Sequence, residues 1–384
     1  MKSRWMIFML LGVLLAACGA VGTNAPQQPT ADIVVAITAT PRPSPTLTPE
    51  QPATPAPGGD GDVVLNPLTG LPPASPDLLE RRPIIVKVQN VPRESRPQWG
   101  LSAADLVFEY YIEYGDTRFA AVYYGQDSQQ VGPIRSARHI DARLIRMYKA
   151  MLVFGGAYED LLDELLSADF GSRLFREGPN TSPALYRYEP EGVNYLMLDT
   201  TKLEDVYQRY GVDNSRQDLT GMTFAPEMPA GGSPGETIYV RFSGGMYHYW
   251  QYDPVSGRYQ RFSETQDDVN RNDPAYAPLL DQSTGEQIAA DNIVVLLAGY
   301  TEVIVGGQVF DVYLEGSGPA YLVRDGLVIP VRWQVDAPDQ LLHLVDESGQ
   351  PVAYRPGTTW YEVIGLSSLV SSDGPVWNFD FLFP

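Results

Sequence analysis

The fold is decided by the stretch Gly132-Pro133-Ile134-Arg135-Ser136-Ala137-Arg138-His139-Ile140-Asp141. Its glycine-proline pair predicts a turn, and the apolar residues that follow recur at helical spacing, which predicts a helix over residues 138–151. The apolar stripe of this helix consists of Ile140, Leu144, Met147 and Met151. An apolar run over residues 152–156 then predicts a buried strand, so the stretch joins a helix to a sheet.

The residues on either side of this stretch complete a mixed sheet with helices. Three strands and one further helix are predicted over residues 83–90, 106–113, 117–124 and 160–170. Between the second and third strands, Gly115-Asp116 has the composition of a two-residue turn. Such a turn would place Glu113 opposite Arg118, where the two side chains would form an ordinary cross-strand ion pair.

The second half of the chain is predicted to be rich in strands. Residues 216–236 are rich in proline and glycine and are predicted to be a linker. We therefore expect an α+β protein, with an N-terminal mixed α/β sheet domain over residues 63–215 and a β-rich C-terminal domain over residues 237–384. Strands of this second domain are predicted over residues 237–242, 246–252, 258–262, 292–297, 303–314, 320–324, 327–334 and 360–363.

The first 62 residues predict export and anchoring. A short basic end followed by the apolar residues 6–15 is typical of a signal peptide, which we expect over residues 1–17. The sequence Leu15-Ala16-Ala17-Cys18 looks like the lipobox of bacterial lipoproteins, so Cys18 is expected to carry the lipid anchor. Residues 18–62 are rich in Pro, Thr, Ala and Gln and cannot bury enough apolar surface to order, which predicts a disordered tether between membrane and folded part.

Composition excludes several classes of function. The 47 acidic and 27 basic residues give a net charge of −20, which argues against nucleic acid as a partner. Cys18 is the single cysteine, so disulfides and cysteine metal cages are excluded. His139, His248 and His343 are isolated in the sequence, without the spacing of metal ligands. We therefore expect neither a metal nor a cofactor.

Arginines near the start of the expected helix are the candidate ligand-binding residues. Arg135 and Arg138, with Arg118 from the neighbouring strand, would place positive charge beside exposed backbone amides, an arrangement that holds anions. Ser136 lies among them and also fits the N-cap of the helix. The alternative is that these arginines form structural ion pairs with nearby carboxylates, namely Glu109, Glu113, Asp116 or Asp141.

Two carboxylates are weak candidates for catalysis. Glu109 and Glu113 face the same side of a predicted strand, but four residues of strand separate them by roughly 13 Å, whereas the two carboxyl groups of glycosidases lie about 5 to 9.5 Å apart. A pair formed by Glu109 and a residue elsewhere, such as Asp141, stays open. Ser136 sits in no nucleophile motif of a hydrolase.

Several separated motifs occur in the order typical of one family. They are Arg96-Pro97-Gln98-Trp99-Gly100-Leu101-Ser102-Ala103-Ala104-Asp105-Leu106-Val107-Phe108-Glu109, Thr117-Arg118-Phe119, Gly132-Pro133-Ile134-Arg135-Ser136-Ala137-Arg138, Thr284-Gly285-Glu286, Ala290-Asp291-Asn292-Ile293-Val294, Gly316-Ser317-Gly318-Pro319-Ala320 and Arg355-Pro356-Gly357-Thr358-Thr359-Trp360. Together they resemble the YerB-like bacterial lipoproteins. That family has N- and C-terminal domains of unknown function, so the resemblance implies a compartment and a fold but no reaction.

The expected protein is lipid-anchored and extracytoplasmic, attached to the bacterial cell membrane. We expect a binding or scaffolding module of the cell envelope, with an anionic envelope ligand, a cell-wall polymer or an envelope protein as its partner. The alternative is an envelope hydrolase or transferase in which Glu109 or Asp141 acts on a substrate held by arginines. The two hypotheses differ in whether these carboxylates and arginines converge on an open cleft.

Overall fold

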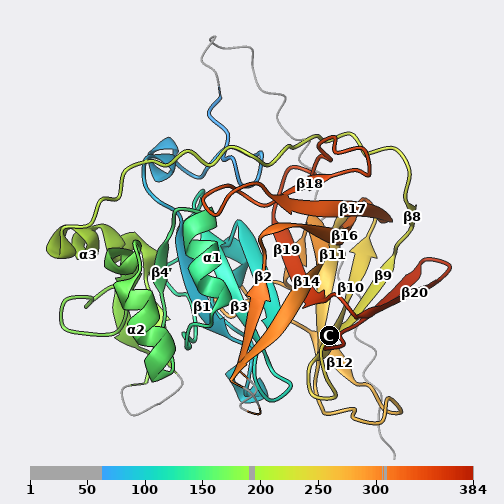
Figure 1. The fold of residues 1–384 in the computed structure, drawn as a ribbon, viewed down its shortest axis with the longest axis horizontal. Coiled ribbons are helices and arrows are strands. Elements are labelled where there is room, and N and C mark those ends of the chain that lie inside the picture. Colours follow the sequence, from blue (N-terminus) through green and yellow to red (C-terminus); the bar gives the residue numbers. More distant parts are fainter. Residues whose placement is uncertain (1–62, 190–194, 305, 307–308, 384) are drawn as a thin grey trace, which may run out of the picture. The chain divides into compact units, whose positions relative to one another are not determined.

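The computed structural model describes residues 63–189, 195–304, 306 and 309–383, drawn in Figure 1. The expected signal peptide (1–17), Cys18 and the expected tether (18–62) lie outside the described residues. Among the residues that are described, no helix has the length and apolar character needed to span a membrane.

Strands dominate the described part of the chain, which confirms the predicted α+β class. The α-helices are α1 (Ile140–Met147), α2 (Glu159–Ser167) and α3 (Leu203–Tyr210). Strands of the first half are β1 (Ile84–Gln89), β2 (Leu106–Tyr111), β3 (Thr117–Tyr123), β4 (Met151–Val153), β5 (Leu174–Phe175), β6 (Leu185–Arg187) and β7 (Leu196–Leu198). Strands of the second half are β8 (Ser233–Pro234), β9 (Thr237–Arg241), β10 (Tyr247–Asp253), β11 (Arg258–Glu264), β12 (Tyr276–Pro278), β13 (Ala289–Ala290), β14 (Asn292–Ile304), β15 (Val309–Tyr313), β16 (Gly316–Arg324), β17 (Leu327–Val335), β18 (His343–Val345), β19 (Thr359–Gly365), β20 (Leu369–Asp373) and β21 (Val376–Asp380). Short 3-10 helices lie at Pro76–Glu80, Arg93–Ser95, Leu101–Ala103, Gly171–Arg173 and Thr200–Lys202.

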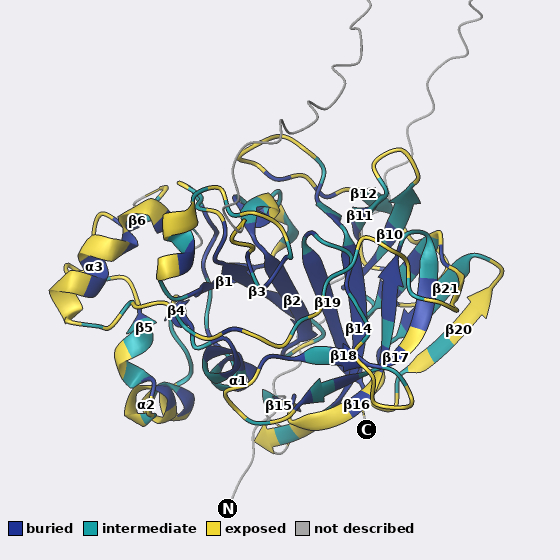
Figure 2. Ribbon diagram, turned by 90° about the horizontal axis from the view of Figure 1, so that it is seen from above, coloured by how far each residue is buried: buried dark blue, intermediate teal, exposed yellow. Residues whose placement is uncertain are grey.

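One large sheet contains strands from both halves of the chain. Its order is β18-β17-β16-β14-β19-β2-β3-β1-β4-β5, with β15 paired to β14 and β8 paired to β17. The two halves meet where β19 lies parallel to β2, with Glu362 beside Glu109. Every residue of β1, β2, β3 and β19 is buried, as Figure 2 shows. The segments expected to form two domains therefore share one hydrogen-bonded sheet.

Different layers cover the two faces of this sheet. A second sheet, of order β12-β11-β10-β9-β21-β20, packs on one face, where Trp250 of β10 contacts Trp360 of β19 with ring centroids 5.2 Å apart. Helix α1 packs on the opposite face, where Tyr148 at its end contacts Phe108 of β2. Successive residues of a strand point to opposite faces, so polar residues along β2 are directed alternately toward the second sheet and toward α1.

Helix α1 is shorter than predicted at both ends. It covers Ile140–Met147 rather than residues 138–151, and the buried residues Ile140, Leu144 and Met147 confirm the predicted apolar stripe. Lys149 adopts a left-handed conformation with φ of 51°, which ends the helix because the chain must reverse before β4 begins. Met151, predicted as the last member of the stripe, is the first residue of β4.

The stretch before α1 is built into the sheet. The backbone of Ile134 forms an antiparallel bridge to Val88, and the Arg135 amide donates to the Lys87 carbonyl at 2.8 Å. Gly132 has a φ of 153°, and a Cβ at this position would lie 2.8 Å from the sulfur of Met197. The turn predicted at Gly132-Pro133 is therefore wrong, because residues 131–134 are extended and bridge to Leu198, Trp99 and Val88.

Candidate functional site

An open cleft lies beyond the end of β1, and we call it the arginine cleft. It has a volume of about 980 Å³. Its lining comes from the segments after β1 and after β11, the turn between β2 and β3 with the start of β3, the segment before α1, and the turn between β9 and β10. Of the residues predicted to bind a ligand, Arg118, Arg135 and Ser136 line it. The structure thus brings together three of the four predicted binding residues.

Arg118 is the most unusual residue of the arginine cleft. It lies on β3 opposite Tyr110 of β2 and Gln89 of β1, and only 7% of its surface is exposed. One guanidinium nitrogen donates to the Ser136 carbonyl at 3.4 Å, while Nε has no hydrogen-bond partner among the described residues. Burial, together with the nearby charge of Arg138, lowers the pKa of Arg118 to about 9. A buried guanidinium without a carboxylate partner is costly, and an anion would lower that cost.

Arg135 is held at the cleft by its backbone. Its amide bonds to β1, and its carbonyl accepts from the Gly155 amide at 2.9 Å, so the residue lies between the ends of β1 and β4. The Arg135 Nε contacts the side-chain oxygen of Gln89, and burial lowers the pKa of Arg135. A second guanidinium is thereby fixed on the same cleft as Arg118.

Ser136 lines the cleft but does not cap the helix, so its predicted second role is wrong. The residue before α1 is His139, three positions later, and it makes no capping hydrogen bond through its side chain. Instead, the Asp141 carboxylate accepts from the amide of Arg138, two residues before the helix begins, at 2.7 Å. Ser136 contributes its carbonyl to Arg118 and lies too early in the chain to reach the helix.

Arg138 is turned away from the cleft by an ion pair. Its guanidinium forms a fork to Glu113, with Nε 2.7 Å from Oε2 and Nη2 in contact with Oε1. The predicted pair of Glu113 with Arg118 is wrong because the turn between β2 and β3 is longer than two residues: Tyr111 pairs with Thr117, and Arg118 therefore lies opposite Tyr110. For Arg138, the structural alternative of an ion pair is confirmed.

Asp141 lies buried under α1, against the sheet. Its Oδ1 accepts from Lys87 Nζ at 2.8 Å and from the Tyr110 hydroxyl at 2.9 Å. Burial lowers the pKa of Lys87 to about 8, although Asp141 opposes that shift. Asp141 is fully buried, with its oxygens occupied by Lys87, Tyr110 and the Arg138 amide. It does not line the arginine cleft.

Glu109 lies on the opposite face of the sheet, in a polar group that we call the inter-sheet cluster. Its Oε2 accepts from Arg261 of β11 at 2.6 Å, and its Oε1 accepts from Thr117 at 2.7 Å. The Arg261 guanidinium also donates to Glu362 at 3.3 Å. Three aromatic rings surround the guanidinium of Arg261, those of Phe119, Trp250 and Trp360. Glu109 is thus fully buried and holds a structural arginine.

Glu362 and His248 complete the inter-sheet cluster. Glu362 Oε1 lies 2.9 Å from His248 Nε2 and accepts from the Trp250 indole at 2.9 Å. Burial raises the pKa of Glu362 to about 7, which Arg261 opposes, and burial lowers the pKa of His248 well below its usual value. Glu362 Oε2 has no hydrogen-bond partner among the described residues. Burial in the cluster thus favours the protonated form of Glu362.

Potential ligand atoms of Glu109, His248 and Glu362 all lie within 4.8 Å of one another, a spacing that would suit a metal ion. However, the Arg261 guanidinium already contacts both carboxylates and supplies the positive charge that a metal would bring. We therefore treat the cluster as an ion-pair network. Sequence reasoning missed it because His248 and Glu362 meet Glu109 only through the pairing of β2 with β19 and the packing of the second sheet.

Comparisons with known proteins agree with this architecture. A family model described as "Protein of unknown function (DUF3048) N-terminal domain" matches residues 68–212, and the model of the corresponding C-terminal domain matches residues 238–361. "Putative lipoprotein YerB" of Bacillus subtilis (strain 168) is 29% identical over 306 residues, which cover 78% of this chain and 85% of the relative. The crystal structure of YerB from Bacillus subtilis has a similar fold, with a TM-score of 0.65 and 24% identity over 78% of this chain and 96% of that one. The chain therefore belongs to the YerB-like family, whose N- and C-terminal domains are of unknown function.

Proposed function

We propose that this protein is a lipid-anchored module of the bacterial cell envelope that binds an anionic ligand in the arginine cleft. Its similarity to a relative described as a lipoprotein supports an envelope lipoprotein, and the sequence Leu15-Ala16-Ala17-Cys18 supports Cys18 as the lipidated residue. The Pro/Thr-rich residues 18–62 then tether the folded part and keep it near membrane and wall partners.

The observation that carries the binding proposal is the state of Arg118. Among the described residues, no carboxylate lies within ion-pair distance of its guanidinium, although the rest of the molecule carries a large acidic excess. Asp116 also lines the cleft, and its charge still favours the protonated form of Arg118 without an ion pair. A ligand anion placed between Arg118 and Arg135 would supply a charge-assisted hydrogen bond to Arg118 Nε, which has no partner among the described residues.

The candidate carboxylates give the enzyme alternative little support. Glu109 is occupied by Arg261 and Thr117, and Asp141 by Lys87 and Tyr110, on opposite faces of the sheet. Neither residue lines the arginine cleft. A general acid or base must reach the proton that it transfers, directly or through one water. The proposal is therefore one of binding, with an anionic wall polymer or an acidic envelope protein as the class of partner.

Calorimetric titration with inorganic phosphate tests the proposal, using the chain without residues 1–17 and with Cys18→Ser so that no lipid is attached. Charge-assisted hydrogen bonds contribute about 1.5–3 kcal/mol, so Arg118→Met should lower the affinity roughly 10- to 150-fold. The variant should fold at least as stably as the parent, because the substitution removes a buried charge that lacks a carboxylate partner.

Arg146→Met provides the matched control. Arg146 lies on α1 outside the cleft, in an exposed ion pair with Asp169 at 2.8 Å, so its loss should leave phosphate affinity unchanged. Equal affinity of the Arg118→Met variant and its parent would remove Arg118 from the binding site. Absence of phosphate binding by the parent would overturn the proposal as a whole.

A further inference from the structure

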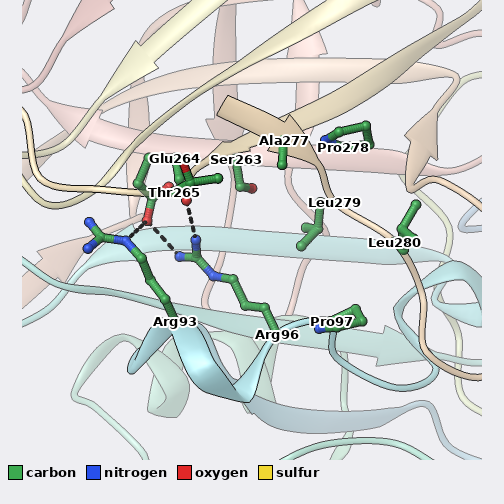
Figure 3. Close-up of a pocket in the computed structure, with 10 residues that line it drawn as sticks. All are labelled: Arg93, Arg96, Pro97, Ser263, Glu264, Thr265, Ala277, Pro278, Leu279 and Leu280. Atoms are coloured by element: carbon green, nitrogen blue, oxygen red, sulfur yellow. Dashed lines mark hydrogen bonds and ion pairs between the residues drawn. The ribbon is translucent and has the colours of Figure 1, made fainter. Parts of the chain in front are cut away.

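A second, smaller space adjoins the arginine cleft, and we call it the apolar cavity. Figure 3 shows the residues that line it. It has a volume of about 310 Å³, which lies at the lower end of the ~300–1,000 Å³ typical of small-molecule sites. One wall is apolar and comes from the loop before the third 3-10 helix and from β12 with the residues after it: Pro97, Ala277, Pro278, Leu279 and Leu280.

Both arginines that line the apolar cavity are ion-paired, Arg96 with Glu264 and Arg93 with Glu264 and Asp267. Glu264 at the end of β11 is buried, and its Oε1 lies 2.8 Å from Arg96 and 3.5 Å from Arg93. Arg96 also donates through Nε to the Asn90 carbonyl at 3.0 Å and through Nη1 to the Glu264 carbonyl at 3.1 Å. These polar groups bond to one another, as the dashed lines of Figure 3 indicate. A ligand entering this cavity would therefore meet mainly the apolar wall.

The two spaces meet at Arg93 and Thr265, which line both of them. Arg93 is fixed in this position, since its Nη2 donates to the Gly245 carbonyl at 2.6 Å and to Asp267 at 2.8 Å. The arginine cleft contains the buried guanidinium of Arg118, which lacks a carboxylate partner among the described residues, and the adjoining space contains the apolar wall. A single molecule that matches both sides must carry an anionic group and an apolar chain.

We propose that the ligand of this protein is an amphiphilic anion, whose charged head binds at Arg118 and Arg135 and whose apolar chain enters the apolar cavity. The inference rests on the proposed anion binding and specifies the class of ligand. Leu280 is 37% exposed in the free protein, and covering its apolar surface would contribute to affinity.

A series of n-alkyl phosphates tests the inference, with methyl, propyl, butyl and hexyl phosphate compared with inorganic phosphate by calorimetric titration. Each methylene group that becomes buried should raise the affinity roughly three- to fourfold, until the cavity is filled. Ala277→Phe should fill the cavity and abolish this dependence on chain length, while leaving the affinity for inorganic phosphate unchanged. Leu280→Asn, at a partly exposed position that tolerates a polar group, should weaken the dependence.

Leu366→Asn is the control, because Leu366 is 53% exposed and does not line either space. It should leave the chain-length dependence intact. If the protein binds phosphate but all alkyl phosphates bind with the same affinity, this inference fails and anion binding stands. A chain-length dependence that survives both Ala277→Phe and Leu280→Asn would also overturn it, since the chain would then lie elsewhere. If neither phosphate nor any alkyl phosphate binds, both proposals fail together.

Discussion

Titration of Glu362 should make the stability of this protein depend on pH. The carboxyl group is fully buried between the sheets, and its pKa is raised from 4.5 to about 7 by burial, against the opposing effect of Arg261. Between these two values, the unfolded chain releases the proton while the folded protein keeps it. The contribution of Glu362 to stability is therefore fully present below pH 4.5 and is lost as the pH rises to 7.

The size of the effect follows from the shift. One pKa unit corresponds to about 1.4 kcal/mol, so the raised pKa of Glu362 should lower the free energy of unfolding by about 3 kcal/mol between pH 4.5 and pH 7.5. Glu362→Gln keeps the shape of the protonated side chain and cannot ionise. We expect the variant to resemble the parent at pH 4.5 and to be more stable by about 3 kcal/mol at pH 7.5.

Urea unfolding of both proteins at steps of half a pH unit measures this difference directly. Other groups also titrate in this range: burial raises the pKa of Asp105 to about 6, and burial lowers the pKa of His248. Subtracting the unfolding free energy of the variant from that of the parent removes the contribution of Asp105, which lies outside the cluster. Glu347→Gln, at an exposed position after β18, controls for the removal of a carboxylate. If the unfolding free energies of the parent and Glu362→Gln differ by the same amount from pH 4.5 to 7.5, the reasoning is refuted.

Two further predictions concern the extended segment before α1 and the membrane anchor. Gly132→Ala should destabilise the fold by about 1–3 kcal/mol, because its φ is 153° and its Cβ would clash with Met197. Gly156→Ala is the control and should be nearly neutral, because no atom of a neighbouring residue lies within 4 Å of its added Cβ. Equal urea midpoints for the two variants would contradict this prediction. Cys18→Ser should move the exported protein from the membrane fraction to the soluble fraction when extracts are separated by centrifugation, and persistent membrane association would exclude Cys18 as the anchor.

Local patterns were sufficient to predict the central strands. The runs that form β1, β2 and β3 are apolar along most of their length and are buried on both faces, so their positions are confirmed within two residues. The predicted stripe of α1 is also buried. Errors arose at the ends of elements, where one residue changes the geometry. The left-handed conformation of Lys149 shortens α1, and the longer turn after β2 moves Arg118 opposite Tyr110.

Long-range pairing explains what the sequence could not predict. Glu109 and Glu362 become neighbours only because β19 joins β2 in parallel, and Arg261 reaches both from a second sheet. No periodicity within one segment carries that information, since the sheet order depends on the packing of the whole chain. The three isolated histidines were predicted to lack metal-ligand spacing along the chain, yet His248 lies beside two carboxylates in space.

Buried cations of this fold differ in whether a carboxylate partner is present. We interpret the paired cations as structural and the unpaired one as part of the proposed binding site. Lys87 is paired with Asp141 under α1, and Arg261 is paired with Glu109 between the sheets, so each buried cation has a buried carboxylate. Arg118 lies on β3 opposite Gln89 and Tyr110, is also buried, and forms no such ion pair among the described residues. A chain with 47 acidic residues has ample means to supply a carboxylate here. Since locally unsatisfied groups are expected where a protein binds something else, the missing partner of Arg118 argues for an external anion.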